Sequence, residues 1–217
     1  MQEMIQTVAI AALPVILAIT LHEAAHGYAA RHFGDPTAWQ EGRITANPLK
    51  HIDPVGTILV PIIILLLSTG GILFGWAKPV PVNFGRLRHP KQDMLWVAAA
   101  GPAANLAMLL FWAMLMKLTV TLPIHFFSVA MARMAEIGIL VNLALMVLNL
   151  FPLPPLDGGR IAVSLLPPKA AWRFAKLEPF GFPILLLLLF TGILSKLLMP
   201  VMSAVMGMIY FIFQFSG

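Results

Sequence analysis

The sequence of 217 residues contains no cysteine, so disulfide bonds and thiolate chemistry are excluded. Charged residues are also scarce, at 11% of the chain against about 25% in ordinary soluble domains. Hydrophobic residues make up 59%. A water-soluble fold of this size cannot cover so much apolar surface, so the composition predicts a protein whose outer surface faces lipid.

The formal net charge of +5 raises the alternative of an anionic partner such as nucleic acid. No basic stripe with interleaved aromatic residues occurs, however, and the basic residues gather between apolar runs. In a membrane protein, basic residues in loops set the orientation in the bilayer. We therefore expect the lipid bilayer, and no nucleic acid, as a partner.

Several apolar runs approach the roughly 20 residues that a helix needs to cross a bilayer. Backbone groups have no water partners there, so we expect these runs to be helices. The sequence predicts an all-α polytopic membrane protein, a single domain over residues 1–217, with about 5–6 membrane-embedded helices. The apolar segments cover residues 4–33, 55–74, 94–118, 131–150, 182–199 and 201–215.

Lysine and arginine predict the topology. Most of them lie in residues 31–53, 75–93 and 158–180, and none lies before Arg31. The positive-inside rule places these three loops in the cytoplasm and the N-terminus outside, in the cell (inner) membrane. A single crossing by residues 55–74 would separate two of these loops. We therefore expect a short extended or re-entrant excursion there, with a plain sixth span as the alternative.

The motif that carries chemistry lies in the first apolar run, where HEAAH begins at His22. Positions i and i+4 share a helix face, so the imidazoles of His22 and His26 can reach one ion. Neutral imidazole suits zinc, and Glu23 between them can serve as general base. Ionisable groups within a membrane helix are costly and usually functional. The motif therefore predicts a metal site.

A catalytic zinc needs a third protein ligand and an open position for water. The remaining candidates are Asp35, Asp53, Asp93, His32, His51, His89, His125, Glu136 and Asp157. We expect the first three carboxylates to be solvated in polar loops and Glu136 to start a helix. Asp157 differs, because prolines end the preceding span and two glycines follow it. Asp157 is therefore the favoured third ligand.

The combined motifs resemble the site-2 protease family of intramembrane zinc metalloproteases, in particular its small bacterial branch. HExxH is followed by N-x-x-P-x-P-x-x-D-G from Asn149 to Gly158. The GPAAN stretch that ends at Asn105 and the GWAKPVPVN stretch at 75–83 also look like that family. The resemblance extends from residue 13 to about residue 200.

The resemblance implies one zinc ion per chain, bound by His22, His26 and Asp157, with Glu23 as the base. It implies hydrolysis of peptide bonds in or near transmembrane segments of other membrane proteins, which is regulated intramembrane proteolysis. The partners would then be the transmembrane segments of substrate proteins, reached from a site that opens toward the cytoplasm.

The resemblance also carries roles for residues outside the metal site. Asn149 matches a position thought to bind the substrate backbone or the developing oxyanion, and Asn105 matches one that lies by the site. Residues 78–83 match a region that can pair with an unwound substrate, and a proline-rich extended segment could offer such an edge. Because 217 residues leave no room for one, we expect no PDZ or CBS domain of the kind that larger members carry.

Two other functions stay open from the sequence. A membrane metal-ion transporter would also place histidines and carboxylates in membrane helices, although transporters usually show internal repeats, and none is found here. A catalytically inactive scaffold that binds membrane proteins could keep the metal, but it would not need Glu23.

Overall fold

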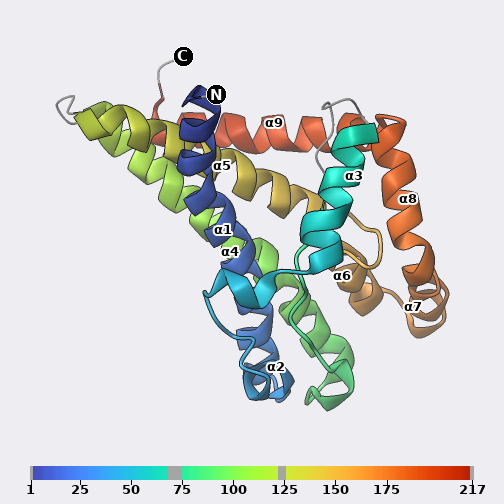
Figure 1. The fold of residues 1–217 in the computed structure, drawn as a ribbon. Coiled ribbons are helices and arrows are strands. Elements are labelled where there is room, and N and C mark those ends of the chain that lie inside the picture. Colours follow the sequence, from blue (N-terminus) through green and yellow to red (C-terminus); the bar gives the residue numbers. More distant parts are fainter. Residues whose placement is uncertain (1, 68–74, 122–125, 216–217) are drawn as a thin grey trace.

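The computed structural model describes residues 2–67, 75–121 and 126–215, and within these ranges the regular secondary structure is helical, without a strand. Four long helices contain apolar stretches that can cross a membrane (Figure 1). They are α1 (Gln2–His32), α4 (Pro90–Thr121), α5 (Phe126–Asn149) and α9 (Ile193–Phe213). The predicted fold class, an all-α polytopic membrane protein, is confirmed.

Shorter elements connect the long helices. They are α2 (Thr37–Gln40), η1 (Pro48–His51), η2 (Pro54–Leu59), α3 (Val60–Leu67), η3 (Phe84–Arg86), α6 (Asp157–Leu165), α7 (Pro168–Ala175) and α8 (Glu178–Phe190). Two of these stretches, at 54–64 and in α8, are apolar. Together with the four long helices they make up the predicted set of five to six membrane-embedded segments.

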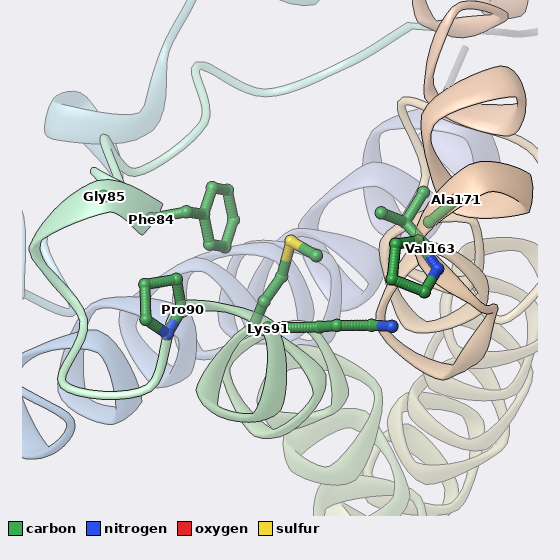
Figure 2. Close-up of a pocket in the computed structure, with 8 residues that line it drawn as sticks. Phe84, Gly85, Pro90, Lys91, Val163 and Ala171 are labelled. Atoms are coloured by element: carbon green, nitrogen blue, oxygen red, sulfur yellow. The ribbon is translucent and has the colours of Figure 1, made fainter.

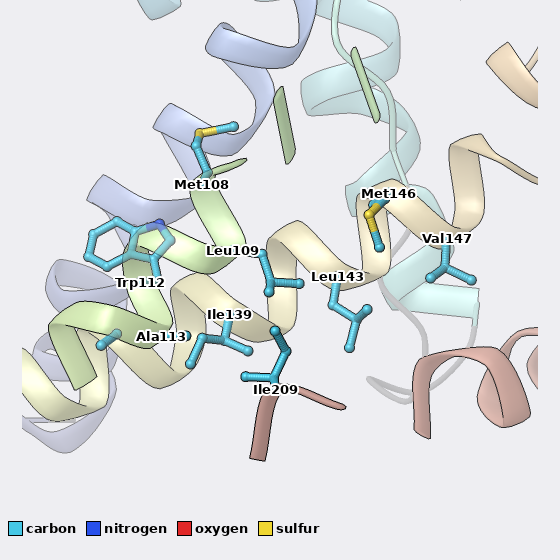
Figure 3. Packing of buried hydrophobic residues seen from close by; sticks show 10 residues of the cluster. Met108, Leu109, Trp112, Ala113, Ile139, Leu143, Met146, Val147 and Ile209 are labelled. Atoms are coloured by element: carbon cyan, nitrogen blue, oxygen red, sulfur yellow. The ribbon is translucent and has the colours of Figure 1, made fainter. Parts of the chain in front are cut away.

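Helices α1, α4 and α5 pack against one another and form the body of the molecule. In Figure 1, α1 and α4 run in opposite directions, and α9, which packs on α5 and α4, lies at the end of the molecule where α1 begins. Figure 3 shows the largest core cluster, which joins α4 to α5 and receives Ile209 from α9. Outside this cluster, many large apolar side chains of the long helices are exposed at the outer surface, among them Leu110, Phe111 and Leu140.

The segment that leaves the body of the molecule after η1 ends next to the residues where it began. The N–H of Trp76 donates to the carbonyl oxygen of Gly56 at 3.0 Å, and the N–H of Lys78 donates to that of His51 at 2.8 Å. A Cβ on Gly56 would lie 2.2 Å from the indole nitrogen of Trp76, so only glycine permits this approach. Residues 68–74 lie outside the described ranges. The two ends of the excursion therefore lie side by side, and its re-entry on one side of the membrane stays a prediction.

The boundary between the last two apolar helices differs from the prediction. Sequence analysis places it at Pro200, between segments 182–199 and 201–215. The structure places it at Gly192, which adopts a φ of +72°, a left-handed conformation that suits glycine. Pro200 instead lies inside α9, and membrane helices tolerate internal proline when neighbouring groups satisfy the freed carbonyl. The predicted boundary was therefore wrong.

The proline-rich stretch after α5 is not a simple loop as predicted. It contains α6 and α7, and α7 begins with Pro168 near its first position, where the missing N–H costs nothing. Asp157 is the first residue of α6, where a carboxylate interacts favourably with the helix dipole. Glu136, expected to start a helix, lies within α5 and is exposed, so that expectation was wrong.

A candidate metal centre between three helices

Three buried side chains from α1 and α6 converge beside α4, on which both helices pack. His22 and His26 lie on one face of α1, and their Nε2 atoms are 3.1 Å apart. The carboxylate of Asp157 approaches both, with Oδ2 at 3.3 Å from Nε2 of His22 and Oδ1 at 3.4 Å from Nε2 of His26. Among the residues that the structure describes, these three form the one cluster able to hold a metal ion.

Helix α4 supports both imidazoles through three residues spaced four apart. The carbonyl oxygen of Val97 lies 2.7 Å from Nδ1 of His26. The side-chain oxygen of Asn105 lies 2.5 Å from Nδ1 of His22. Between them, Gly101 faces the rings, and a Cβ there would lie 2.4 Å from Nε2 of His26. Because residues at i, i+4 and i+8 share one helix face, α4 presents a single supporting stripe.

These contacts determine which ring nitrogens carry protons. A carbonyl oxygen can only accept, so Nδ1 of His26 must be the donor to Val97. The amide nitrogen of Asn105 donates to the carbonyl of Ala18 at 3.2 Å and to the side-chain oxygen of Asn142 at 2.9 Å. Its oxygen therefore faces His22 and accepts from Nδ1. In the neutral rings, both Nε2 atoms then carry lone pairs.

The cluster fits a metal site on the chemistry of its atoms. Two Nε2 lone pairs and a carboxylate face one another, and Oδ2 of Asp157 is buried without a hydrogen-bond donor among the described residues. Converging buried acceptors are costly unless a cation lies between them. Two imidazoles and one carboxylate form a ligand set that zinc commonly takes in catalytic sites.

The carboxylate is ionised even when a proton takes the place of a metal ion. Burial alone raises the pKa of Asp157, but the charge and hydrogen bonds of His22 and His26, when their Nε2 atoms are protonated, outweigh this effect and lower it to about 2. A ligand to a metal ion must be deprotonated, so Asp157 meets this condition at neutral pH.

Two glycines bring Asp157 into place by allowing close backbone contact. A Cβ on Gly158 would lie 2.2 Å from the carbonyl oxygen of Leu150, and one on Gly159 would lie 2.3 Å from the nitrogen of Pro154. The sequence predicted that these glycines permit a tight turn. The structure gives a different reason, since both lie in the first turn of α6 and let that turn pack on the preceding chain.

Glu23 lies beside the cluster and contacts the extended segment at 77–83. Its Oε2 accepts a hydrogen bond of 2.8 Å from the N–H of Val80. Arg43, a buried residue, donates to the carbonyl oxygens of Lys78 and Pro79 at 3.0 and 3.1 Å. The guanidinium therefore holds the segment against α1 at the position of Glu23.

Most of the backbone N–H groups of this segment already have partners within the chain. The N–H groups of Lys78 and Val80 donate to His51 and Glu23, and the N–H of Asn83 donates to Asp35 at 2.6 Å. Prolines 79 and 81 have no N–H. Pairing of residues 78–83 with a substrate strand stays a prediction, and three of the N–H groups that it could use already donate within the chain.

Among the described contacts, none joins Asn149 to the metal-binding cluster. Its amide nitrogen donates to the carbonyl oxygen of Leu145, one turn earlier in α5, at 3.0 Å. Asn105 does contact His22, but at Nδ1, and not at Nε2, the ring nitrogen that faces the other two ligands. Substrate or oxyanion binding by either asparagine stays a prediction.

Two of the acids expected to be solvated are buried, which corrects the sequence analysis. Asp35 accepts from the N–H and hydroxyl of Thr37 and from the segment at 77–83, and Asp93 accepts from the N–H of His89 at the start of α4. Short-range capping of this kind satisfies a carboxylate without solvent. Asp53 is half-buried and caps η2 through the N–H groups that follow it.

The other histidines lie away from the cluster. His32 is exposed at the end of α1, and His89 is exposed before α4. His51 is buried, and its Nε2 lies 2.9 Å from the carbonyl oxygen of Thr45. His125 lies outside the described residues. None of the three described histidines belongs to the metal-binding group.

Sequence analysis missed three residues that shape the centre. Asn142 bonds Asn105 from α5, Gly101 leaves room for both rings, and Arg43 holds the segment at Glu23. A signal existed for Asn142, because a buried amide in an otherwise apolar span usually bonds a neighbouring helix. The roles of Gly101 and Arg43 depend on contacts between distant segments, which no local pattern reveals.

A separate apolar pocket of about 330 Å³ lies between the start of α4 and the α6–α7 region (Figure 2). Its lining is Phe84, Gly85, Pro90, Lys91, Met94, Val163, Pro168 and Ala171. No side chain of the metal-binding cluster lines it, so the pocket is distinct from the candidate centre.

Comparison with known proteins identifies relatives that cover most of the chain. One is "Putative zinc metalloprotease YwhC" of Bacillus subtilis, which is 39% identical over 195 residues, or 88% of this chain and 85% of that protein. Proteins of the same designation, named Rip2, are 33% identical in Mycolicibacterium smegmatis and 30% identical in Mycobacterium tuberculosis. Both alignments cover 93% of this chain and 72% of the relative. No family model and no solved structure matches the chain.

Proposed function

The chain belongs to the zinc metalloprotease family of YwhC and Rip2, and we propose that it is an intramembrane protease of the site-2 type. It hydrolyses peptide bonds in or near the transmembrane segments of other membrane proteins. One zinc ion per chain, held by His22, His26 and Asp157, serves this reaction.

The observation that carries this proposal is the convergence of three buried lone-pair donors beside a glutamate. Two ligands come from HExxH in α1, and the third comes from α6 after a proline-rich turn. The fourth direction around a catalytic zinc must stay open. A purely structural zinc site would be expected to close with a fourth ligand, and the described cluster has three members.

The chain's own residues have distinct tasks in this reaction. A zinc ion held at the centre supplies Lewis acidity that activates water and polarises a peptide carbonyl. Glu23 takes a proton from the attacking water at its carboxylate and delivers it to the leaving amine. Val97 and Asn105 fix the rings of His26 and His22, so that both Nε2 atoms stay available as ligands.

The proposed location follows from the apolar helices and the basic loops. The protein resides in the cell membrane with its N-terminus outside, and the centre opens toward the cytoplasm, from which water reaches it. Substrates are membrane-spanning helices whose carbonyls are occupied by internal hydrogen bonds. They unwind locally before attack, so segments weakened by glycine or proline are preferred.

The test compares purified wild-type protein with Glu23→Gln for zinc content and for cleavage of membrane-inserted peptides. Glutamine can still accept from Val80, so we expect full zinc content and a loss of cleavage by about 10²–10⁴-fold. Loss of zinc from this variant, or normal cleavage by it, would refute the role of Glu23. Zinc uptake with no cleavage by the wild-type protein would favour the transporter or the scaffold.

A further inference from the structure

We propose that Asn142 is a positioning residue of the metal centre, because it fixes the orientation of Asn105 and thereby the tautomer of His22. The inference rests on the proposed function and deepens it, since neither the family motifs nor the ligand set includes Asn142. The residue lies on α5, within an apolar span, and its side chain is fully buried.

The hydrogen bonds form a directed chain across three helices. The amide nitrogen of Asn142 donates to the carbonyl oxygen of Gly138 at 2.8 Å. Its oxygen accepts from the amide nitrogen of Asn105 at 2.9 Å. The oxygen of Asn105 in turn faces Nδ1 of His22 at 2.5 Å. This series of hydrogen bonds ends at the backbone carbonyl of Gly138, which can only accept. Asn142 must therefore donate to Gly138 and accept from Asn105, and Asn105 must accept from His22.

The direction matters because an amide side chain can turn over with little change in shape. In the alternative orientation, the NH₂ group of Asn105 would face His22, and Nδ1 would have to accept. The proton of the neutral ring would then move to Nε2, the atom that faces His26 and Asp157. Protonated Nε2 cannot bind a metal ion, so the wrong orientation of Asn105 removes one ligand.

Two acceptors hold Asn105 in the useful orientation. One is the carbonyl oxygen of Ala18 at 3.2 Å, and the other is the side-chain oxygen of Asn142 at the shorter distance of 2.9 Å. Without Asn142, the fully buried amide of Asn105 would keep only the longer bond on its nitrogen. An unpaired buried N–H is costly, so the preference between the two orientations becomes weaker.

The experiment uses full-length protein in detergent and the variant Asn142→Leu. One measurement is the zinc affinity, by competition with a chelator. The other is the ¹⁵N spectrum of the imidazoles in the metal-free protein, with the His22 signals assigned by their absence in His22→Gln. We expect zinc affinity to fall by roughly 10–100-fold and the Nε2–H form of His22 to become populated.

Two further variants separate positioning from general stability. Leu143→Ala removes a buried side chain next to Asn142 that is not part of the chain of hydrogen bonds. It should lower the melting temperature and leave the His22 tautomer unchanged. Asn142→Asp is the conservative variant, because one carboxyl oxygen can still accept from Asn105 and the other, when protonated, can donate to the carbonyl oxygen of Gly138. It should keep the wild-type tautomer of His22 and change zinc affinity by less than about threefold.

The proposal is overturned if Asn142→Leu lowers the melting temperature while the His22 tautomer and the zinc affinity both stay as in the wild-type protein. Asn142 would then only tie α5 to α4. If the wild-type protein binds no zinc at all, the proposed function fails. The tautomer measurement is made without metal, so it still decides the role of Asn142 in that case.

Discussion

The N–H of Val80 donates a hydrogen bond of 2.8 Å to Oε2 of Glu23, across 57 residues of sequence. The carbonyl oxygen on the other side of the same peptide bond, that of Pro79, accepts from Arg43. One peptide unit therefore joins a buried guanidinium to the carboxylate of the proposed base. A carboxylate held by one oxygen keeps its other oxygen available for a proton.

Arg43→Met should impair cleavage without removing zinc. The carbonyls of Lys78 and Pro79 lose their buried donor, at a cost of roughly 1–3 kcal/mol in stability. The extended segment would then hold Glu23 less firmly, and we expect kcat to fall by about tenfold. Steady-state cleavage and zinc analysis of the same preparation check this prediction. Arg86→Met, on an exposed arginine of the neighbouring turn, is the matched control and should leave both values unchanged.

Asp157→Ala should weaken zinc binding by more than about 100-fold, the upper range found for groups just outside a ligand shell. Two imidazoles would then be left to hold the ion without a carboxylate to offset its charge. The control is Asp53→Ala, which removes a helix cap at a cost of about 0.5–2 kcal/mol in stability and should bind zinc normally. Chelator competition measures both variants, and equal affinities would exclude Asp157 as a ligand.

Gly101→Ala should disrupt the centre through a single methyl group. The added Cβ would lie 2.4 Å from Nε2 of His26 and 2.6 Å from Cε1 of His22, so the rings or the helix must shift. We expect zinc affinity to drop by at least about tenfold. Gly207→Ala places the same methyl group in open space on α9 and should be silent. If both variants bind zinc like the wild type, α4 does not support the rings as described.

Single cysteines introduced at Arg86 and Lys169 should react with an impermeant thiol reagent only from the cytoplasmic side. A cysteine at Thr121, at the far end of α4, should react only from outside. The chain has no native cysteine, so each label reports one position. Labelling of residue 86 from outside would contradict the re-entrant excursion and would favour a full crossing between η1 and η3.

The sequence was sufficient for the features that depend on local periodicity. It predicted the helical class, the shared face of His22 and His26, and Asp157 as the favoured partner, although zinc binding by these residues stays a prediction. It misplaced the last helix boundary because it weighted Pro200 over Gly192. Proline inside a membrane helix depends on its neighbours, whereas a left-handed glycine ends a helix by its own conformation.

Other features could not be predicted because they depend on how two helices are aligned. Burial of Asp35 follows from its contact with Asn83, which lies 48 residues away. The match of Gly101 to the imidazoles requires the relative rotation and depth of α1 and α4. Neither quantity leaves a trace in hydrophobic periodicity, since both helices are apolar on several faces.

The stripe of Val97, Gly101 and Asn105 has a consequence for assembly of the protein. One residue of slippage between α4 and α1 is a shift of about 1.5 Å with a rotation of about 100°. Such a shift would replace all three supports at once and would turn the side chain of Ala100 or Pro102 toward the rings. Only one alignment of the two helices therefore creates a competent ligand pair. Zinc uptake would then act as a readout of correct helix pairing, so that misaligned molecules remain metal-free and inactive.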